Sequence, residues 1–320
     1  MDPRLKRLVT IINKKSKSNI VFTIDDERKR PFKDRLGFGI PTLDSILYGG
    51  IPDKPCFIEF FGKESSGKTY LACMLAKRIQ ESGDNVFYVD AEGSLDLGHI
   101  QGLGVNPEMF AFTQESGAER VFDIICKVVE MPEPPKLIVV DSVAALTPEK
   151  EEPDKMGVAE LARVLSRGLR VVNQINKSSI ILLINQVRET ISLYAAETTP
   201  GGRALRHWSS IRMDIRQGTR IKQSDAPTHK KHIGKEKDDV IGHHINIKVA
   251  KNKTAIPFGS TRLFYYTDTG VDILEDTVRH AIQTGEIDQT GAYYRYGEHK
   301  YHGRDAIINA LAQGEISIGT

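Results

Sequence analysis

The sequence predicts an α/β fold with a mainly parallel, twisted sheet, preceded by an N-terminal arm and followed by a small C-terminal α/β domain. Two observations support this prediction. Short apolar runs alternate with amphipathic helical patterns through the middle of the chain, as expected for parallel strands joined by crossover helices. A glycine-rich motif lies between the first of these runs and the first of these helices. With 320 residues, of which 40% are hydrophobic and 27% charged, the chain is long enough for a large core.

The first 35 residues are predicted to form an arm and a linker. Asp2 and Pro3 can begin a helix as its cap and first residue, and the apolar residues 5, 8, 9 and 12 then share one face. Such a short helix is marginally stable alone, so it must dock on a neighbouring copy or fold back on its own chain. A strand-like run follows at residues 20–24, and a charged stretch at residues 25–35 separates the arm from the main body.

The central region, residues 36–270, contains most of the predicted strands and helices. Strands are expected at residues 56–61, 85–90, 136–141, 179–185, 210–216, 245–250 and 262–267. Helices are expected at residues 67–81, 118–130 and 158–175. The later strands have no long helices between them, which predicts an antiparallel part after the parallel one. In such sheets ligands bind at the carboxyl ends of the strands.

Two long stretches lack periodicity. Residues 187–204 contain a Thr-Thr-Pro-Gly-Gly sequence, and residues 218–240 are rich in Lys and His. Loops of this length inside a domain are usually functional or disordered. From about residue 271 the pattern changes to short helices at 271–283 and 304–312 around a tyrosine-rich run, which predicts a small C-terminal domain at residues 271–320.

Composition favours a soluble, cytoplasmic protein. The three cysteines, Cys56, Cys73 and Cys126, fit no zinc-binding spacing and lie in apolar patterns, as buried reduced thiols do. No apolar run approaches the roughly 18 residues of a transmembrane helix, and no signal peptide is visible.

The net charge is +2, but the charges are unevenly distributed. Residues 1–35 carry eleven Lys and Arg against five Asp and Glu, and residues 271–320 carry four against eight. This asymmetry suits polyanion binding or head-to-tail self-association, and solvated faces without a partner explain it equally well.

The glycine-rich motif has the spacing of a phosphate-binding P-loop and reads Gly62-Lys63-Glu64-Ser65-Ser66-Gly67-Lys68-Thr69. Its glycines allow backbone N–H groups to converge on phosphate oxygens, and the N-terminus of the following helix adds partial positive charge. Lys68 is expected to reach the β- and γ-phosphates of a nucleotide, and the Thr69 hydroxyl is expected to bind Mg²⁺. The alternative is a Gly/Ser turn that binds nothing, but the flanking strand and helix argue against it.

Three polar residues at strand ends supply the rest of the expected chemistry. Asp141 ends a buried strand and is expected to hold Mg²⁺ through its water shell. Glu92 follows the second strand, whose end is expected beside the P-loop strand, so this carboxylate is placed to orient the attacking water. Gln186 ends the fourth strand and leads into the loop at 187–204, so it is placed to sense the γ-phosphate and to couple nucleotide state to that loop. Each has a structural alternative, as a turn cap, a surface acid or an ordinary strand-end amide.

Lys251 and Lys253 close a later strand at alternate positions, so they share one face of it. They are distant in sequence from the P-loop, and they could supply charge to the phosphates of an adjacent subunit, as arginine fingers do in trans. From the pattern alone, a solvated strand end is the stronger interpretation.

In this order and spacing, the motifs resemble the bacterial RecA recombinase family over residues 36 to 304. The matching segments are the P-loop motif, Asp90-Ala91-Glu92, and the runs at residues 139–148, 184–188, 197–205 and 249–253. The resemblance implies a RecA-type P-loop NTPase core in a DNA-dependent ATPase that forms helical filaments on single-stranded DNA. It also implies strand exchange with homologous duplex DNA in recombination and the repair of DNA damage. ATP and Mg²⁺ are the implied cofactors, with ATP bound between adjacent protomers of the homo-oligomer, and no membrane partner is expected.

The resemblance also assigns roles residue by residue. The implied catalytic residues are Lys68, Glu92 and Gln186 and, in trans, Lys251 and Lys253. The implied nucleotide contacts are Gly62, Glu64, Ser65, Ser66, Gly67, Lys68, Thr69, Tyr70, Asp96 and His99, and the implied metal contacts are Thr69 and Asp141. DNA is implied to bind two loops, residues 148–157 and 188–203, together with Arg163, Ser166, Arg170, Arg188, Gly201, Gly202 and Arg203. The N-terminal arm resembles the family's polymerisation helix and strand, which explains why a marginal amphipathic helix is present.

Several residues depart from the family pattern. His99 stands where the family has a tyrosine over the adenine, Lys63 replaces a proline, His207 replaces an interface phenylalanine, and Arg203 replaces an asparagine. The second loop is shorter, the segment 218–240 is longer, and the family's acidic C-terminal tail is absent. These departures leave the ATP chemistry intact and keep two alternatives open. One is a filament-forming DNA-binding regulator or mediator without strand exchange, and the other is a RecA-like hexameric motor.

Overall fold

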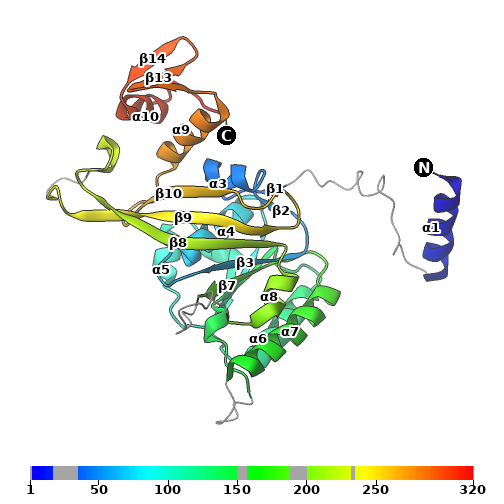
Figure 1. Ribbon diagram of the computed structural model, residues 1–320. Helices are drawn as coiled ribbons and strands as arrows, with labels where there is room; N and C mark the ends of the chain where they lie inside the picture. The colour runs from blue at the N-terminus through cyan, green and yellow to red at the C-terminus, as the bar shows by residue number, and fades with distance from the viewer. Residues whose placement is uncertain (1, 17–34, 150–156, 188–199, 232–234, 320) are drawn as a thin grey trace, which may run out of the picture. The chain divides into compact units, whose positions relative to one another are not determined.

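The structure is a computed structural model that describes residues 2–16, 35–149, 157–187, 200–231 and 235–319 (Figure 1). The chain divides into two compact units, residues 1–35 and 36–320. In the first unit, α1 (Pro3–Ser16) confirms the helix expected at the N-terminus. Asp2 caps this helix by accepting a hydrogen bond from the backbone N–H of Arg4 at 2.7 Å, and Leu5, Leu8 and Ile11 are exposed on its surface. The strand predicted at 20–24 lies outside the described residues.

A nine-stranded sheet forms the centre of the second unit, in the order β11-β10-β9-β8-β3-β7-β6-β4-β5. Strands β8, β3, β7, β6, β4 and β5 pair in parallel, whereas β9, β10 and β11 continue the sheet in antiparallel pairs. The predicted parallel sheet with a late antiparallel part is therefore confirmed. The strands are β3 (Cys56–Gly62), β4 (Val86–Asp90), β5 (Phe110–Thr113), β6 (Leu137–Asp141), β7 (Ile180–Gln186), β8 (Ile211–Lys222), β9 (Val240–Asn252), β10 (Ser260–Tyr266) and β11 (Gly270–Val271).

The register brings the carboxyl ends of the parallel strands together at one edge of the sheet. Gly62 at the end of β3 pairs with Gln186 at the end of β7, and Asp90 on β4 pairs with Asp141 on β6. One expectation was wrong: β4 is not beside the P-loop strand, because β7 and β6 lie between β3 and β4. The chain order of strands does not reveal this, since the crossover connections decide which strands become neighbours.

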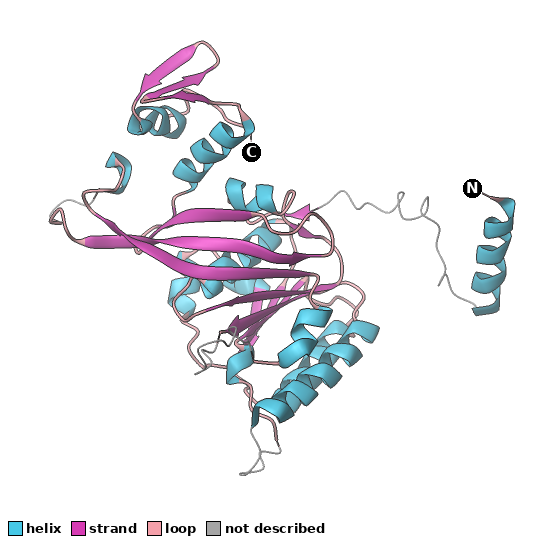
Figure 2. Ribbon diagram, in the orientation of Figure 1, coloured by secondary structure: helices cyan, strands magenta, loops and turns pink. Residues whose placement is uncertain are grey.

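Helices pack on both faces of this sheet (Figure 2). One hydrophobic cluster joins the sheet to α3 (Pro41–Ile46), α4 (Lys68–Glu81) and α5 (Leu97–Gly102). The other joins it to α6 (Ala118–Val129), α7 (Gly157–Ile175) and α8 (Gly202–Trp208). Neighbouring residues of β3 point into different clusters: Ile58 and Phe60 into the first, and Phe57 into the second. The three helices predicted here, α4, α6 and α7, have nearly the expected bounds.

The last part of the chain belongs to the same compact unit but has a hydrophobic cluster of its own. The helices α9 (Ile273–Thr284) and α10 (Arg304–Ala312) confirm the two predicted there. Between them lies a three-stranded antiparallel sheet of β12 (Asp288–Thr290), β13 (Tyr293–Tyr296) and β14 (His299–His302). The remaining short elements are β1 (Arg35–Leu36), β2 (Ile51–Pro52) and the 3₁₀ turns η1 (Pro107–Met109), η2 (Val143–Ala145) and η3 (Thr228–Lys230).

The polar stretch at 218–240 is only partly a loop. Strand β8 runs to Lys222 and β9 begins at Val240, so these two strands form a longer hairpin than predicted. A small hydrophobic cluster holds the hairpin extension together and consists of Ile221, Ala226, Ile241 and Tyr266. Strands with an exposed face carry polar side chains there. The end of β8 and the start of β9 therefore contain no continuous apolar run and were not predicted as strand.

Candidate nucleotide-binding site

The P-loop motif forms the turn between β3 and α4. Gly67 caps α4 with a φ of 93°, and a Cβ atom there would lie 2.6 Å from Cδ1 of Ile245. A Cβ atom on Gly62 would lie 1.9 Å from the backbone oxygen of Ile215. Only glycine therefore fits at these two positions, and a turn this tight lets successive backbone N–H groups surround an anion.

The side chain of Lys68 is buried within the P-loop itself. Its Nζ donates to the backbone oxygen of Lys63 at 2.6 Å and of Gly62 at 3.2 Å, and to Oγ of Ser66 at 3.3 Å. Burial lowers the pKa of Lys68, and the carboxylates of Asp141 and Glu92 oppose that shift. The ammonium group is thus positioned inside the turn expected to surround phosphate oxygens.

Thr69 and Asp141 form the candidate metal site. Oγ1 of Thr69 donates to Oδ2 of Asp141 at 2.7 Å, and the hydroxyl of Tyr88 donates to the same oxygen at 2.7 Å. Burial raises the pKa of Asp141, while these two hydrogen bonds lower it. A hydroxyl and a carboxylate are hard oxygen ligands of the kind that Mg²⁺ uses together with water and substrate phosphates, so the residues fit this metal.

Glu92 lies near the same site although its strand is distant from β3 in the sheet. Oε1 of Glu92 accepts hydrogen bonds from Oγ of Ser142 and from Nε2 of Gln186, the latter at 3.1 Å. Because Gln186 pairs with Gly62 across β7 and β3, it connects the carboxylate to the start of the P-loop. Gln186 ends β7, Ser142 directly follows β6, and Glu92 lies in the turn after β4, so three different strands contribute to this contact. The structure thus brings together Glu92, Gln186 and the P-loop, as the sequence motifs predict.

A cavity of about 330 Å³ adjoins the P-loop. Its lining contains the expected Ser65, Ser66, Gly67, Lys68, Thr69 and Tyr70, and also His243, Ile245 and Tyr265 from β9 and β10. The hydroxyl of Tyr70 accepts a hydrogen bond from the backbone N–H of Val271 at 2.9 Å, so its ring is fixed against the β10–β11 turn. Burial lowers the pKa of His243.

Other predicted nucleotide contacts lie outside the lining of this cavity. Asp96 caps α5 by accepting a hydrogen bond from the backbone N–H of His99 at 3.0 Å, and both residues belong to this short helix region. Glu64 is exposed in the P-loop turn. The structure therefore groups the phosphate-binding residues and leaves Glu64, Asp96 and His99 as predictions.

Lys251 and Lys253 lie at the edge of the sheet opposite the P-loop. Lys251 pairs with Arg212 of β8, which pairs with Glu59 of β3, three residues before Gly62. At about 3.3 Å per residue, this offset is about 10 Å along the strand, to which the sideways step across two strands is added. The register therefore separates Lys251 from the P-loop of its own chain.

Both lysines instead contact the C-terminus of α8. Nζ of Lys251 donates to the backbone oxygens of Arg206 and His207, and Nζ of Lys253 donates to that of His207 at 3.0 Å. Cations are favourable at a helix C-terminus because its carbonyl groups carry partial negative charge. Burial and the nearby Lys253 ammonium lower the pKa of Lys251.

The predicted DNA-contacting residues lie on α7 and at the start of α8. Arg163, Ser166 and Arg170 are exposed on α7, and Arg163 pairs with Glu160 at 3.0 Å. Gly201, with a φ of 86°, caps α8, which begins at Gly202 and Arg203. Arg188 lies outside the described residues, as do most of the two predicted loops.

Asn185 connects the end of the predicted second loop to the buried Glu59 of β3. Its side-chain amide donates to the backbone oxygen of Pro200 at 3.0 Å and to Oε1 of Glu59 at 3.1 Å. Glu59 is fully buried and pairs with Arg212 at 2.5 Å. Adjacent residues of β7 thus contact the loop end through Asn185 and the Glu92 carboxylate through Gln186.

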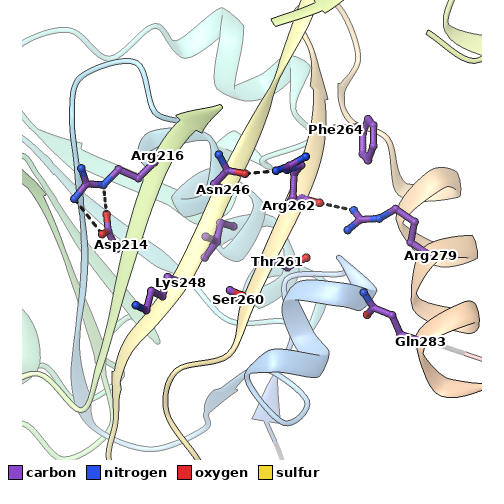
Figure 3. A pocket seen from close by; sticks show the side chains of 11 residues that line it. Asp214, Arg216, Asn246, Lys248, Ser260, Thr261, Arg262, Phe264, Arg279 and Gln283 are labelled. Carbon is purple, nitrogen blue, oxygen red and sulfur yellow. Dashed lines mark hydrogen bonds and ion pairs between the residues drawn. The ribbon is translucent and has the colours of Figure 1, made fainter. Parts of the chain in front are cut away.

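A second cavity, of about 610 Å³, lies between the antiparallel strands and α9 (Figure 3). Figure 3 shows Arg216 paired with Asp214, Arg262 bonded to Asn246, and Arg279 of α9 reaching the backbone oxygen of Arg262. Lys248 also lines this cavity. Four cationic side chains against a single carboxylate make its lining electropositive.

A parallel sheet with a P-loop, a strand-end acid bonded to the P-loop threonine and a carboxylate bonded to a strand-end amide is typical of P-loop proteins that bind and hydrolyse nucleotides. The RecA N-terminal domain family matches residues 4–272. Protein RecA from Thermus aquaticus is 36% identical over 307 residues, covering 90% of this chain and 86% of the relative. Protein RecA from Geobacter metallireducens is 34% identical over 311 residues, covering 94% and 87%. Protein RecA from Borreliella burgdorferi is 35% identical over 287 residues, covering 87% and 75%.

The chain therefore belongs to the RecA family, whose members are DNA-dependent ATPases of homologous recombination. The fold and family inferred from the sequence motifs are confirmed. No helix among the described residues is long and apolar enough to cross a membrane.

Several residues around the site were missed by sequence analysis. Tyr88 donates to Asp141, Ser142 donates to Glu92, and Asn185 precedes Gln186 and donates to Pro200. His243 and Tyr265 line the cavity beside the P-loop. Ser142 and Asn185 directly adjoin Asp141 and Gln186 in sequence, so strand-end position could have identified them. Tyr88, His243 and Tyr265 carry no comparable signal, since only the sheet register brings them to the site.

Proposed function

We propose that this protein is a DNA-dependent ATPase that assembles into helical filaments on single-stranded DNA and exchanges strands with homologous duplex DNA. A cytoplasmic location agrees with this role. The proposal rests on one observation above all: neighbouring residues of β7 contact the catalytic carboxylate and the end of the second loop. A change on either side of this strand end can be transmitted to the other over a single peptide unit.

In this proposal the P-loop binds the phosphates of ATP. Gly62 to Thr69 supply backbone N–H groups, and Lys68 exchanges its contacts within the loop for phosphate oxygens. Thr69 and Asp141 hold Mg²⁺, which neutralises charge developing on the phosphates when it is bound. Glu92 orients the attacking water and accepts its proton, since the carboxylate is held by two donors from other strand ends.

Gln186 acts as the sensor of the γ-phosphate. Its amide donates to Glu92 in this structure, and it can turn toward a γ-phosphate because it pairs with the first residue of the P-loop. Asn185 then shifts with it and moves Pro200, at the end of the second loop. Order in that loop depends in this way on the nucleotide, as in other γ-phosphate switches.

Lys251 and Lys253 complete the site of a neighbouring protomer. The register supports this role, because it places Lys251 two strands away from β3 and level with Glu59, three residues before the P-loop begins at Gly62. The same lysines hold the C-terminus of α8, the helix that follows the second loop. Contact with a neighbour's phosphates would therefore also alter the support of a helix next to bound DNA.

Single-stranded DNA is proposed to bind along α7 and the start of α8, through Arg163, Ser166, Arg170, Arg188, Gly201, Gly202 and Arg203. Cationic side chains neutralise its phosphates, and the glycines allow the backbone to approach closely. Strand exchange needs room for a second DNA molecule. The electropositive cavity beside α9 (Figure 3) is the candidate surface for the duplex.

The decisive experiment compares ATP turnover with and without single-stranded DNA, followed by a joint-molecule assay with homologous duplex. We expect DNA to stimulate turnover and joint molecules to accumulate. Turnover that does not respond to DNA would refute the proposed coupling. DNA-stimulated turnover without joint molecules would instead support a regulator or mediator, and rings in negative stain would support a hexameric motor.

A further inference from the structure

The segment between β8 and β9 contains a strap, defined here as residues 223–231, that contacts the C-terminal part of the chain. Oγ1 and the backbone N–H of Thr228 donate to Oδ2 of Asp305 at 2.5 and 3.3 Å. Nε2 of His229 lies 2.7 Å from Oδ2 of Asp272. These contacts join residues that are 77 and 43 positions apart in the sequence.

A third contact comes from Lys230. Its Nζ donates to Oγ1 of Thr269 at 2.9 Å and lies 5.3 Å from the centre of the Tyr266 ring. Three consecutive residues of the strap, which form η3, thus contact two residues in the connection between β10 and α9, Thr269 and Asp272, and one in α10, Asp305. A solvated loop would not be expected to place three successive side chains on one neighbouring surface.

The base of the strap is fixed to the core. The backbone N–H of Gln223 donates to the oxygen of Asp239 at 2.8 Å, and that of Ser224 to the oxygen of Lys237 at 3.0 Å. Ala226 is buried against Ile221, Ile241 and Tyr266. The strap is therefore held at one end by the β8–β9 hairpin and at the other by the C-terminal part.

Asp272 is the residue through which the strap can control α9. It begins that helix, since its Oδ1 accepts a hydrogen bond from the backbone N–H of Glu275 at 3.2 Å. Its other oxygen is the one that faces His229, and its side chain is almost completely buried. The Asp272 carboxylate thus caps α9 and also forms a hydrogen bond with His229 of the strap.

We propose that residues 223–231 are an interdomain strap that locks the C-terminal part, residues 271–320, to the ATPase core, with His229 as its positioning residue. The strap fixes the N-terminus of α9, and α9 contributes Arg279 and Gln283 to the wall of the electropositive cavity (Figure 3). Release of the strap would let this wall move relative to the sheet. This role for the unusually long segment between β8 and β9 does not depend on the proposed function.

Hydrogen–deuterium exchange of the full chain tests the strap. In His229→Ala we expect the amides of α9 and α10 to exchange at least tenfold faster than in the wild type, with β3, β6 and β7 unchanged. In His229→Gln the side-chain amide can still donate to Asp272, so exchange should return close to the wild-type rate. Lys231→Ala is the matched control, because its side chain is exposed on the same strap, and its exchange should not change.

A substitution of Asp305 in α10, which accepts hydrogen bonds from Thr228 of the strap, gives an independent variant. Asp305→Asn weakens the bond from Thr228 without altering the strap, and it should speed exchange in α10 while the core strands stay protected. If His229→Ala also disturbed the core strands, this second variant would decide the question. Unchanged exchange of α9 and α10 in both variants would overturn the proposal.

Discussion

The two carboxylates beside the P-loop, Glu92 and Asp141, are each held by hydrogen bonds from residues of other elements. Glu92 accepts from Ser142 and Gln186, and Asp141 accepts from Thr69 and Tyr88. Such support fixes the orientation of a carboxylate before substrate binds, which is what positioning catalysis needs. The grouping of Asp141, Glu92 and Gln186 near the P-loop could be predicted because each stands at or just after the end of an apolar run. Their supporting contacts could not, since they depend on sheet register.

The first residue-scale prediction concerns hydrolysis. Glu92→Gln keeps an oxygen that can accept from Ser142 and Gln186 but removes the basic carboxylate. We expect ATP turnover to fall by roughly 100-fold or more, while nucleotide binding is retained. Turnover and equilibrium binding of a fluorescent nucleotide measure the two effects. Glu133→Gln, at an exposed site, is the control, and normal turnover in Glu92→Gln would show that another group activates the water.

The second prediction at the residue scale concerns how the charge of Asp141 affects the stability of the fold. Burial raises the pKa of Asp141 above the ordinary value of an aspartate, so the folded state binds this proton more tightly than the unfolded state does. Ionisation therefore costs stability as pH rises above about 4. In the absence of Mg²⁺, Asp141→Asn should raise the free energy of unfolding at pH 7, because the variant avoids the cost of burying a charge while its oxygen still accepts from Thr69 and Tyr88.

Thermal unfolding of Asp141→Asn and wild type at several pH values measures this difference. The gain should shrink as the pH falls toward 4, where the wild-type carboxyl becomes protonated. Addition of Mg²⁺ and nucleotide should stabilise the wild type more than the variant. An equal or lower melting temperature for Asp141→Asn at neutral pH without metal would contradict the argument.

At the scale of elements, α8 contacts three parts of the protein: the second loop, the core and the lysines at the end of β9. Its N-terminus begins at the end of the second loop, its body packs through Leu205 into the core, and its C-terminus is held by Lys251 and Lys253. A short helix with few internal hydrogen bonds depends on such outside support. Its ends are therefore expected to respond to both DNA and nucleotide.

Gly201 provides a test of this element. It has a φ of 86°, and a Cβ atom would lie 2.7 Å from side-chain carbons of Leu165 and Leu205. We expect Gly201→Ala to destabilise the fold by roughly 2–4 kcal/mol, from left-handed strain and overpacking together. Gly202→Ala is the matched control: its φ is also positive, but its nearest contact is 3.7 Å away. Thermal unfolding should rank Gly201→Ala well below Gly202→Ala, and equal losses would contradict this account.

The longer helices could be predicted from the sequence, but the short helices α3, α5 and α8 could not, because six or seven residues show too little periodicity. Periodic apolar faces located α4, α6, α7, α9 and α10 almost to the residue. Strand β5 was missed because it is only four residues long, and two of them are exposed although three are apolar. The order of strands could not be deduced either, so Glu92 was expected beside the P-loop strand. It reaches the site through Gln186 instead, from two strands farther away.

At the scale of the whole molecule, the arm and the main body are separate compact units. Helix α1 has three large apolar side chains that are about half exposed, and such a face needs a partner. Deletion of residues 1–24 should leave residues 36–320 folded, with nearly unchanged melting temperature, but should block long filaments. Electron microscopy with single-stranded DNA and a slowly hydrolysed ATP analogue checks this. Long filaments from the truncated protein would refute a polymerisation role for the arm.

The placement of Lys251 and Lys253 at the edge of the sheet opposite the P-loop has a consequence for how activity scales with assembly. If each nucleotide-binding site needs lysines from the next protomer, an open filament has one fewer complete site than it has protomers. A single protomer then has no complete site. Specific activity should then climb with protein concentration and level off as assemblies lengthen. Such a protein is inactive as a monomer and hydrolyses ATP only where many protomers have assembled on DNA.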